Sequence, residues 1–200
     1  VMENLTTPGG NITGVKLSQN QGRRLELLLE VSPDIQRIFF PYNPDDAAPN
    51  GAMVQIVEFA SERGIEIVEG FARNDEEVSI LLNNIPADMD AIFMLPDSTI
   101  NAHVNDLVAI AIENQWPVSA PSIAQVEDGA LMAYGIIHEE AGAQAAPMAD
   151  QILKGANPAE LPVQTAEYYL GINLQTAQAI GIELPASLVQ AAEVIVTIEE

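Results

Sequence analysis

The sequence predicts an α/β fold in which a doubly wound, mostly parallel sheet is sandwiched by helices. Short runs that are apolar throughout, such as Ala91–Leu95, have the length of buried strands. Helix-length amphipathic stretches separate these runs, and that alternation is typical of a parallel sheet covered on both faces. Two hundred residues, of which 48% are hydrophobic, are enough to build such a core.

A glycine-rich segment near the start, Pro8–Val15, could be a phosphate-binding loop or a turn. A phosphate loop needs a strand before it, a helix after it and a Lys-Ser or Lys-Thr pair at its end. The sequence PGGNITGV instead precedes a strand expected at 12–17, and no such pair follows it. We therefore interpret the segment as a turn that enters a strand.

Strand and helix patterns alternate along the first half of the chain. Apolar residues at helical spacing (Leu25, Leu28 and Leu29) predict a helix that begins at Gln21 and stops at Pro33. The expected elements that follow are a strand at 37–44, a helix at 48–63, a strand at 65–71 and a helix at 75–85.

The second half continues this alternation and then loosens. A buried strand at 89–96 precedes a helix at 98–115, which we expect Ser98 or Thr99 to cap. An Ala-rich helix is expected at 138–154, and Pro147 should kink or interrupt it. The remaining expected elements are strands at 116–121 and 129–136, a short strand that begins at Tyr168, helices at 175–180 and 186–190, and a last strand at 192–200.

Charge and composition exclude several classes of function. Twenty-nine acidic residues against seven Lys and Arg give a formal net charge of −22, which repels nucleic-acid backbones. The absence of cysteine excludes thiol catalysis, disulfides and thiolate metal sites, and two histidines leave little room for a histidine metal centre. We expect no metal and no cofactor. No apolar run reaches membrane-helix length, and no signal segment is visible in this chain.

Four segments that each follow a predicted strand form the candidate site: 41–46, 95–99, 119–122 and 133–138. In doubly wound sheets, ligands bind beyond the carboxyl ends of the strands. Asp97 directly follows a buried strand, so its carboxylate could cap the next helix or accept a ligand's ammonium or hydroxyl group. Tyr42 and Tyr134 end two strands, where each could stack on a ligand or cover the edge of the core.

Several stretches resemble the extracellular solute-binding proteins of ABC transporters, in particular the tryptophan/tyrosine type. The resemblance is carried in chain order by LTTPGGNITGV, MDAIFMLPDSTI, AGAQAAPMADQILKGANPAELPVQ and LGINLQTAQAIGIELPASLVQAAEVI, among others. It implies a type I periplasmic-binding-protein fold, whose lobes are Rossmann-like and close on a small molecule. It also implies one wall of the ligand cleft, formed by Tyr42, Asn43, Asp97, Ser98, Thr99, Ser122 and Tyr134.

The same resemblance divides the chain into a ligand-binding lobe at 1–137, a crossover helix and connector at 138–166, and a return to the lobe at 167–200. The first lobe of the family is then missing, so helix 138–154 should pack on its own sheet or on a second copy in a homodimer. Three places depart from the family pattern: Asp97 follows Pro96 with one residue fewer between them, Ala120-Pro121-Ser122 lacks an acid, and Ile137 stands where an Asp usually follows Tyr-Gly-Ile. The lost Asp removes a possible acceptor for an amino-acid ligand.

The resulting hypothesis is a non-enzymatic solute-binding component of an ABC uptake system. It would bind a small, aromatic amino-acid-like ligand between two lobes, contact a membrane permease, and lie outside the cytoplasm as a periplasmic protein or cell-surface lipoprotein. One alternative is the extracytoplasmic sensor domain of a signalling receptor with the same fold. A second alternative is an α/β enzyme that uses the strand-end carboxylates.

Overall fold

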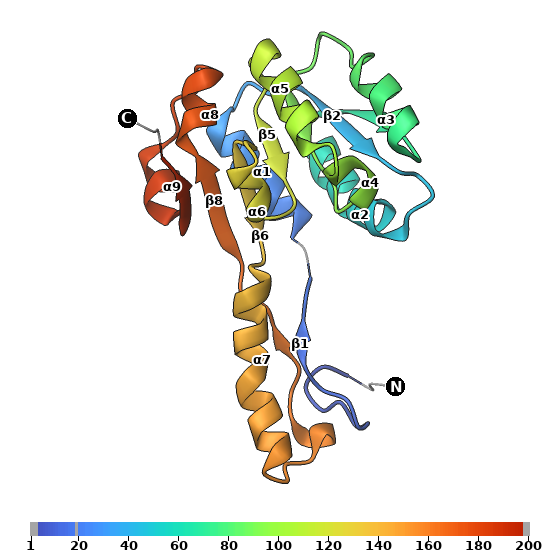
Figure 1. Cartoon of the computed structure of the whole chain (residues 1–200), viewed down its shortest axis with the longest axis vertical. Coiled ribbons are helices and arrows are strands. Elements are labelled where there is room, and N and C mark those ends of the chain that lie inside the picture. The colour runs from blue at the N-terminus through green and yellow to red at the C-terminus, as the bar shows by residue number, and fades with distance from the viewer. Residues whose placement is uncertain (1–3, 19, 198–200) are drawn as a thin grey trace. The chain divides into compact units, whose positions relative to one another are not determined.

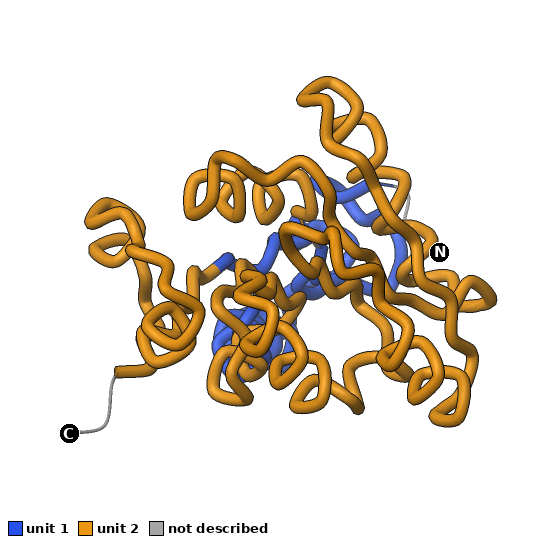
Figure 2. Tube along the Cα trace, turned by 90° about the horizontal axis from the view of Figure 1, so that it is seen from above, with its two compact units in different colours: residues 1–19, 136–168 blue, residues 20–135, 169–200 orange. Residues whose placement is uncertain are grey.

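The computed structural model describes residues 4–18 and 20–197 (Figure 1). The chain divides into two compact units, Val1–Gln19 with Ile136–Tyr168 and Asn20–Gly135 with Tyr169–Glu200, which Figure 2 colours separately. Residues 1–19 group with the 136–168 segment and not with the α/β core.

The larger unit is built on a seven-stranded sheet in the order β3-β2-β4-β5-β6-β8-β9. Neighbouring strands are parallel except β6 and β8, which pair antiparallel. The mostly parallel, doubly wound sheet predicted from the sequence is therefore confirmed. Its strands are β2 (Arg37–Tyr42), β3 (Glu66–Phe71), β4 (Ala91–Phe93), β5 (Val118–Ala120), β6 (Met132–Gly135), β8 (Tyr169–Asn173) and β9 (Val194–Val196).

Helices cover both faces of this sheet (Figure 1). On one face, Phe40 and Phe93 from adjacent strands stack with centroids 5.2 Å apart, in one apolar cluster with Leu25 and Leu28 of α1. Phe39 points to the opposite face, because side chains alternate along a strand. The helices of this unit are α1 (Gln21–Val31), α2 (Ala47–Glu62), α3 (Asp75–Leu82), α4 (Ser98–Asn101), α5 (Val104–Asn114), α6 (Ala124–Glu127), α8 (Leu174–Ala179) and α9 (Ala186–Ala191).

The helix expected at 98–115 is two helices, which corrects the prediction. Asp97, and not Ser98 or Thr99, caps α4. The chain leaves the helical path at His103, whose backbone precedes α5. At the break, the His103 ring contacts Asp75 of α3 at 3.2 Å and Asp106 of α5 at 3.4 Å.

The smaller unit contains a two-stranded parallel sheet, β1 (Val15–Lys16) with β7 (Gln164–Thr165), the helix α7 (His138–Leu153) and a 3₁₀ turn at Pro158–Glu160. The strand expected at 12–17 is thus only two residues long and lies outside the main sheet. Of the two effects expected of Pro147, a kink or an interruption, the interruption does not occur, because α7 continues through it. Ala143, whose carbonyl loses its N–H partner to the proline ring, is exposed, so water can satisfy that oxygen.

Candidate functional site

The candidate site is the edge of the sheet where β2, β4, β5 and β6 end. These four strands are adjacent and parallel, so the loops that follow them leave the sheet at the same edge. The sequence-predicted residues fall on these loops or strand ends. Tyr42 is the last residue of β2, and Asn43 follows it. Asp97, Ser98 and Thr99 come after β4, Ser122 comes after β5, and Tyr134 lies in β6.

Asp97 ties two of these loops together. Its side chain is 1% exposed, and Oδ1 accepts the backbone N–H groups of Thr99 at 2.9 Å and Ile100 at 3.1 Å. Its other oxygen, Oδ2, accepts the N–H of Asn43 at 2.5 Å. The carboxylate therefore caps α4 and also fixes the end of β2. Of the two roles left open by the sequence, the geometry shows the structural one.

Tyr42 is enclosed at the end of β2. Its side chain is 6% exposed, its ring meets Phe71 edge-on with centroids 5.3 Å apart, and its hydroxyl donates to Oε1 of Glu69 at 2.6 Å. Burial, followed by the hydrogen bond to Glu69, raises the pKa of the phenol to about 12. Tyr42 is thus a rigid, neutral group at the edge, held by the neighbouring strand β3.

The loop after β2 is shaped by short hydrogen bonds and one ion pair. The Asn43 side chain accepts the N–H of Asp45 at 3.0 Å, and Asp46 caps α2 through the N–H of Ala48. Arg73, in the loop after β3, pairs with Asp45 at 3.0 Å. Sequence reasoning missed this pair, because a scattered arginine and a loop aspartate carry no pattern that brings them together.

The remaining predicted residues are more accessible. Ser98 is exposed, and Thr99, Ser122 and Tyr134 are partly buried. The backbone N–H of Ser122 donates to the side chain of Gln125 at 3.1 Å, which fixes the loop after β5. Thr99 and Ser122 place hydroxyl groups on the loops at this edge, and Tyr134 packs partly against the apolar core cluster. Contact of these residues with a ligand stays a prediction.

A buried arginine lies beneath this edge. Arg24 of α1 is 1% exposed, and its guanidinium carbon lies 3.8 Å from the centroid of the Phe93 ring. Nη2 donates to the carbonyl of Met94 at 2.6 Å and to Oε1 of Gln21 at 2.7 Å. A signal for this burial is present in the sequence, because Arg24 occupies the apolar stripe of α1, next to Leu25 and one turn before Leu28.

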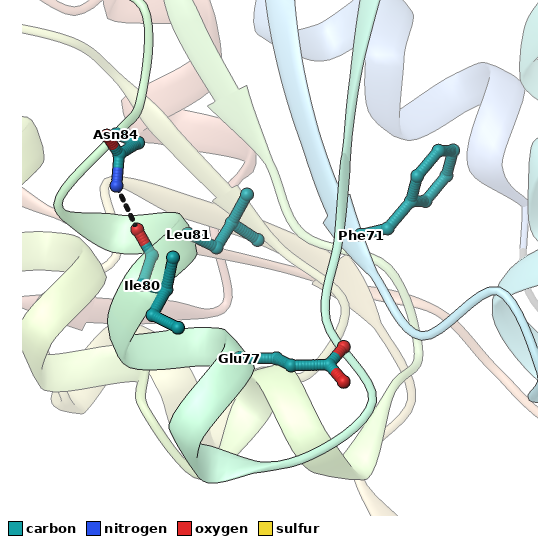
Figure 3. A pocket seen from close by; sticks show the side chains of 5 residues that line it. All are labelled: Phe71, Glu77, Ile80, Leu81 and Asn84. Carbon is teal, nitrogen blue, oxygen red and sulfur yellow. Dashed lines mark hydrogen bonds between the residues drawn. The ribbon is translucent and has the colours of Figure 1, made fainter.

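A separate pocket of about 240 Å³ lies at α3 (Figure 3), and none of the predicted site residues lines it, although its Phe71 contacts the ring of Tyr42. It is lined by Phe71, Glu77, Ile80, Leu81 and Asn84. Its walls are mostly apolar side chains, and the Asn84 amide is bonded to the carbonyl of Ile80 at 2.7 Å. The pocket offers few polar groups to orient a ligand, so we place the candidate site at the strand ends instead.

Residues 4–18 and 20–197 contain no cluster of three or more His, Asp or Glu side chains suited to a metal ion. Within the same ranges, no helix has the length and hydropathy needed to cross a bilayer.

The family described as ABC transporter substrate binding protein matches residues 1–196. The chain is 26% identical over 184 residues to a tyrosine-binding protein of Clostridioides difficile, covering 92% of this chain and 53% of that protein. It therefore spans about half the length of that relative.

Solved structures of similar fold give the same picture. A conserved domain protein from Vibrio cholerae superposes with a TM-score of 0.82 at 29% identity, over 96% of this chain and 66% of the other. A domain from Streptococcus pneumoniae in complex with L-Trp superposes with a TM-score of 0.77 at 27% identity, over 97% of this chain and 68% of the other. A ligand-free, open substrate binding protein from Clostridium difficile superposes with a TM-score of 0.81 at 26% identity, over 98% of this chain and 66% of the other.

More distant solute-binding proteins, with D-allose or α-D-tagatopyranose bound, share the fold at 17% and 13% identity and TM-scores of 0.58 and 0.55. The fold is therefore that of the type I periplasmic binding proteins. Because the family match covers nearly every residue, this chain belongs to the ABC transporter substrate binding protein family.

Proposed function

We propose that this chain is the ligand-gripping part of the solute-binding component of an ABC uptake system, and that its ligand is a small aromatic amino acid. The observation that carries the proposal is the edge formed by β2, β4, β5 and β6. There, four loops with hydroxyl and aromatic side chains leave adjacent parallel strands of a chain that the family matches from 1 to 196. Ligands of such sheets bind at this edge.

The proposed ligand class comes from two relatives. One is a tyrosine-binding protein, and the other is a domain solved in complex with L-Trp. Tyr134, partly buried at the end of β6, supplies an aromatic face for stacking, and Thr99 and Ser122 supply hydroxyl groups. The resemblance implies that an Asp usually stands where this chain has Ile137, so we propose that the ammonium of the ligand is bound by a different acceptor.

The geometry of Asp97 supports a binding role over an enzymatic one. The enzyme alternative relied on strand-end carboxylates that act as acid or base. Asp97 is 1% exposed and already accepts three backbone N–H groups, which leaves it little capacity for proton transfer.

Several parts of the proposal concern the whole protein. The partner is a membrane permease, and the location is outside the cytoplasm. The ligand-binding lobe is formed by the α/β unit, residues 20–135 and 169–200. Segment 138–166 is the crossover that packs on another lobe or on a second copy. The exposed side chain of Leu153, which is 88% exposed at the end of α7, supports such packing.

The test is calorimetric titration of the full-length gene product that contains this chain with L-tyrosine and L-tryptophan. Tyr134→Leu keeps apolar bulk but removes the aromatic face, and we expect it to weaken binding about fivefold. Thr99→Ala removes one hydroxyl and should also weaken binding. Ser79→Ala, which removes an exposed hydroxyl from α3, is the matched control and should leave affinity unchanged. Failure of the unaltered protein to bind any amino acid, or conversion of the ligand to a product, would contradict the proposal.

A further inference from the structure

Arg24 is a buried cation whose hydrogen-bonding capacity is only partly used. Its side chain is 1% exposed, and Nη2 donates both hydrogen bonds that the guanidinium makes to the described residues. Among the described residues, Nε and Nη1 have no hydrogen-bond partner. Buried donors without partners are rare in folded proteins and are costly, so this arrangement requires an explanation.

The charge of Arg24 is also uncompensated. The other four arginines (Arg23, Arg37, Arg63 and Arg73) all form ion pairs with carboxylates. Within the described ranges, no carboxylate pairs with Arg24, although the chain carries 29 acidic residues. Burial lowers the pKa of its guanidinium, but a guanidinium stays protonated at neutral pH. The fold therefore holds a lone positive charge inside a strongly acidic protein.

A second unsatisfied group lies on the same face of the sheet. Ser119 of β5 is fully buried, and its Oγ has no partner in the described part of the chain. Ser119 is the register partner of Phe93, the residue whose ring contacts the Arg24 guanidinium. Directly paired residues on parallel strands point to the same side, so the guanidinium and the hydroxyl share one face of β4 and β5.

Both groups lie close beneath the candidate edge. Arg24 donates to the carbonyl of Met94, the first residue after β4, and the loop from there leads to Asp97. Phe93 is the last residue of β4 and Ser119 is the last but one of β5, so this row lies at the strand ends. Two residues along a strand span about 7 Å, so both groups lie within about that distance of the loops that follow. A positive charge at this depth acts on any group bound over the edge, because the intervening protein screens it less than water does.

We propose that Arg24 is a specificity-determining residue whose buried charge selects a ligand that carries a carboxylate. The inference rests on the proposed function and adds to it the chemical group that is recognised. A protein of net charge −22 repels anions from its surface, so binding a carboxylate requires a local positive charge. Arg24 supplies that charge at the place where the ligand is expected, and Ser119 provides a hydroxyl beside it.

The experiment compares ligands that differ only in the carboxylate. L-tyrosine and tyramine, and in parallel L-tryptophan and tryptamine, are titrated calorimetrically into the full-length gene product that contains this chain. We expect the amino acids to bind more tightly than the amines. Arg24→Met keeps a flexible side chain without charge or unpaired donors, and it should lower amino-acid affinity roughly tenfold or more. The same variant should leave the affinity of the amines within about twofold.

Arg24→Lys and Arg23→Met test whether the charge of Arg24 is responsible, and a third variant is held in reserve in case Arg24→Met does not fold. Arg24→Lys restores a positive charge and should recover most of the preference for the carboxylate. Arg23→Met removes an adjacent but exposed charge, paired with Glu26 and Glu30, and should leave the preference unchanged. Arg24→Gln retains a donor for Met94 and replaces Arg24→Met if the latter does not fold, as judged by its melting temperature.

The outcomes separate this inference from the proposed function. Equal weakening of amino acid and amine by Arg24→Met overturns the inference, because it reveals a purely structural role. An unchanged preference in that variant overturns it as well. If the unaltered protein binds none of the four compounds, the proposed function itself fails, before any variant of Arg24 is measured.

Discussion

The carboxylate of Asp97 accepts the backbone N–H of Asn43 at 2.5 Å, across 54 residues of sequence. With its other oxygen, Asp97 caps α4 through the N–H groups of Thr99 and Ile100. One buried side chain therefore fixes the end of β2 and the start of α4. The two loops that hold five of the seven predicted ligand-binding residues are positioned by this contact.

Asp97→Ala removes all three acceptor bonds and leaves the Asn43 N–H without its partner. Loss of a helix cap together with an unsatisfied backbone donor predicts a fall of about 2–4 kcal/mol in the free energy of unfolding. Urea denaturation measures this change. Ser98→Ala, an exposed neighbour without such bonds, should stay within about 0.5 kcal/mol of the unaltered protein. Equal stabilities for the two variants would contradict the role assigned to Asp97.

Periodicity and turn residues predicted the main sheet and most helix boundaries well. Leu25 and Leu28 in α1 and the apolar run of β4 are strong local patterns, and buried elements follow such patterns closely. The break between α4 and α5 was missed, because it depends on the contact of His103 with Asp75 of α3. A contact between residues far apart in sequence leaves no mark on local periodicity.

The sequence predicted which strands end at a common edge of the sheet, but not the contacts made there. In doubly wound sheets ligands bind beyond the carboxyl ends of the strands, so the four predicted strand ends indicated which loops to consider. The sequence could not show that the Asp97 carboxylate accepts hydrogen bonds from backbone N–H groups, because that depends on the pairing of β2 with β4. It also could not show that Arg24 is buried without a carboxylate, because an arginine in a helix is usually solvated.

Tyr42→Phe should show how firmly β3 holds the end of β2. The variant keeps the ring against Phe71 and loses the hydroxyl bond to Glu69, so we expect a loss of about 1 kcal/mol in stability. The folded-state pKa of about 12 lies above the ordinary value of 10. This contribution is therefore complete below pH 10 and is lost as the pH rises toward 12. Spectrophotometric titration of the folded protein should lose one high-pH phenol in the variant, and an unchanged titration would refute the assignment.

His103 should make the contact between α3 and α5 dependent on pH. The hydrogen bond to Asp75, followed by that to Asp106, raises the pKa of His103 above 6.5. A raised folded-state pKa means that the stabilisation is complete below pH 6.5 and is lost as the pH rises through the folded-state value. Asp75→Asn should lower the pKa of His103 in an NMR titration. Glu76→Gln removes the neighbouring charge, for which no contact with His103 is found in the described residues, and should shift that pKa less.

Gly135 should be intolerant of any side chain, because β6 packs closely on the loop after β5. A Cβ at this position would lie 2.8 Å from the carbonyl oxygen of Pro121, a backbone atom that cannot rotate away. Gly135→Ala should therefore destabilise the protein by about 1–3 kcal/mol and displace the adjacent Tyr134 from the loop that carries Ser122.

Gly142→Ala is the matched control for this change. Gly142 lies inside α7 with open space around its Cα, so alanine there should stabilise the helix by about 0.5–1 kcal/mol. The melting temperatures of both variants measure these changes in stability, and titration with an amino acid measures their effect on binding. If Tyr134 contributes to the site, Gly135→Ala must also weaken binding, whereas Gly142→Ala must not. A Gly135→Ala protein as stable as the unaltered one would show that the loop after β5 can move away from β6, and the rigid edge assumed for the site would be wrong.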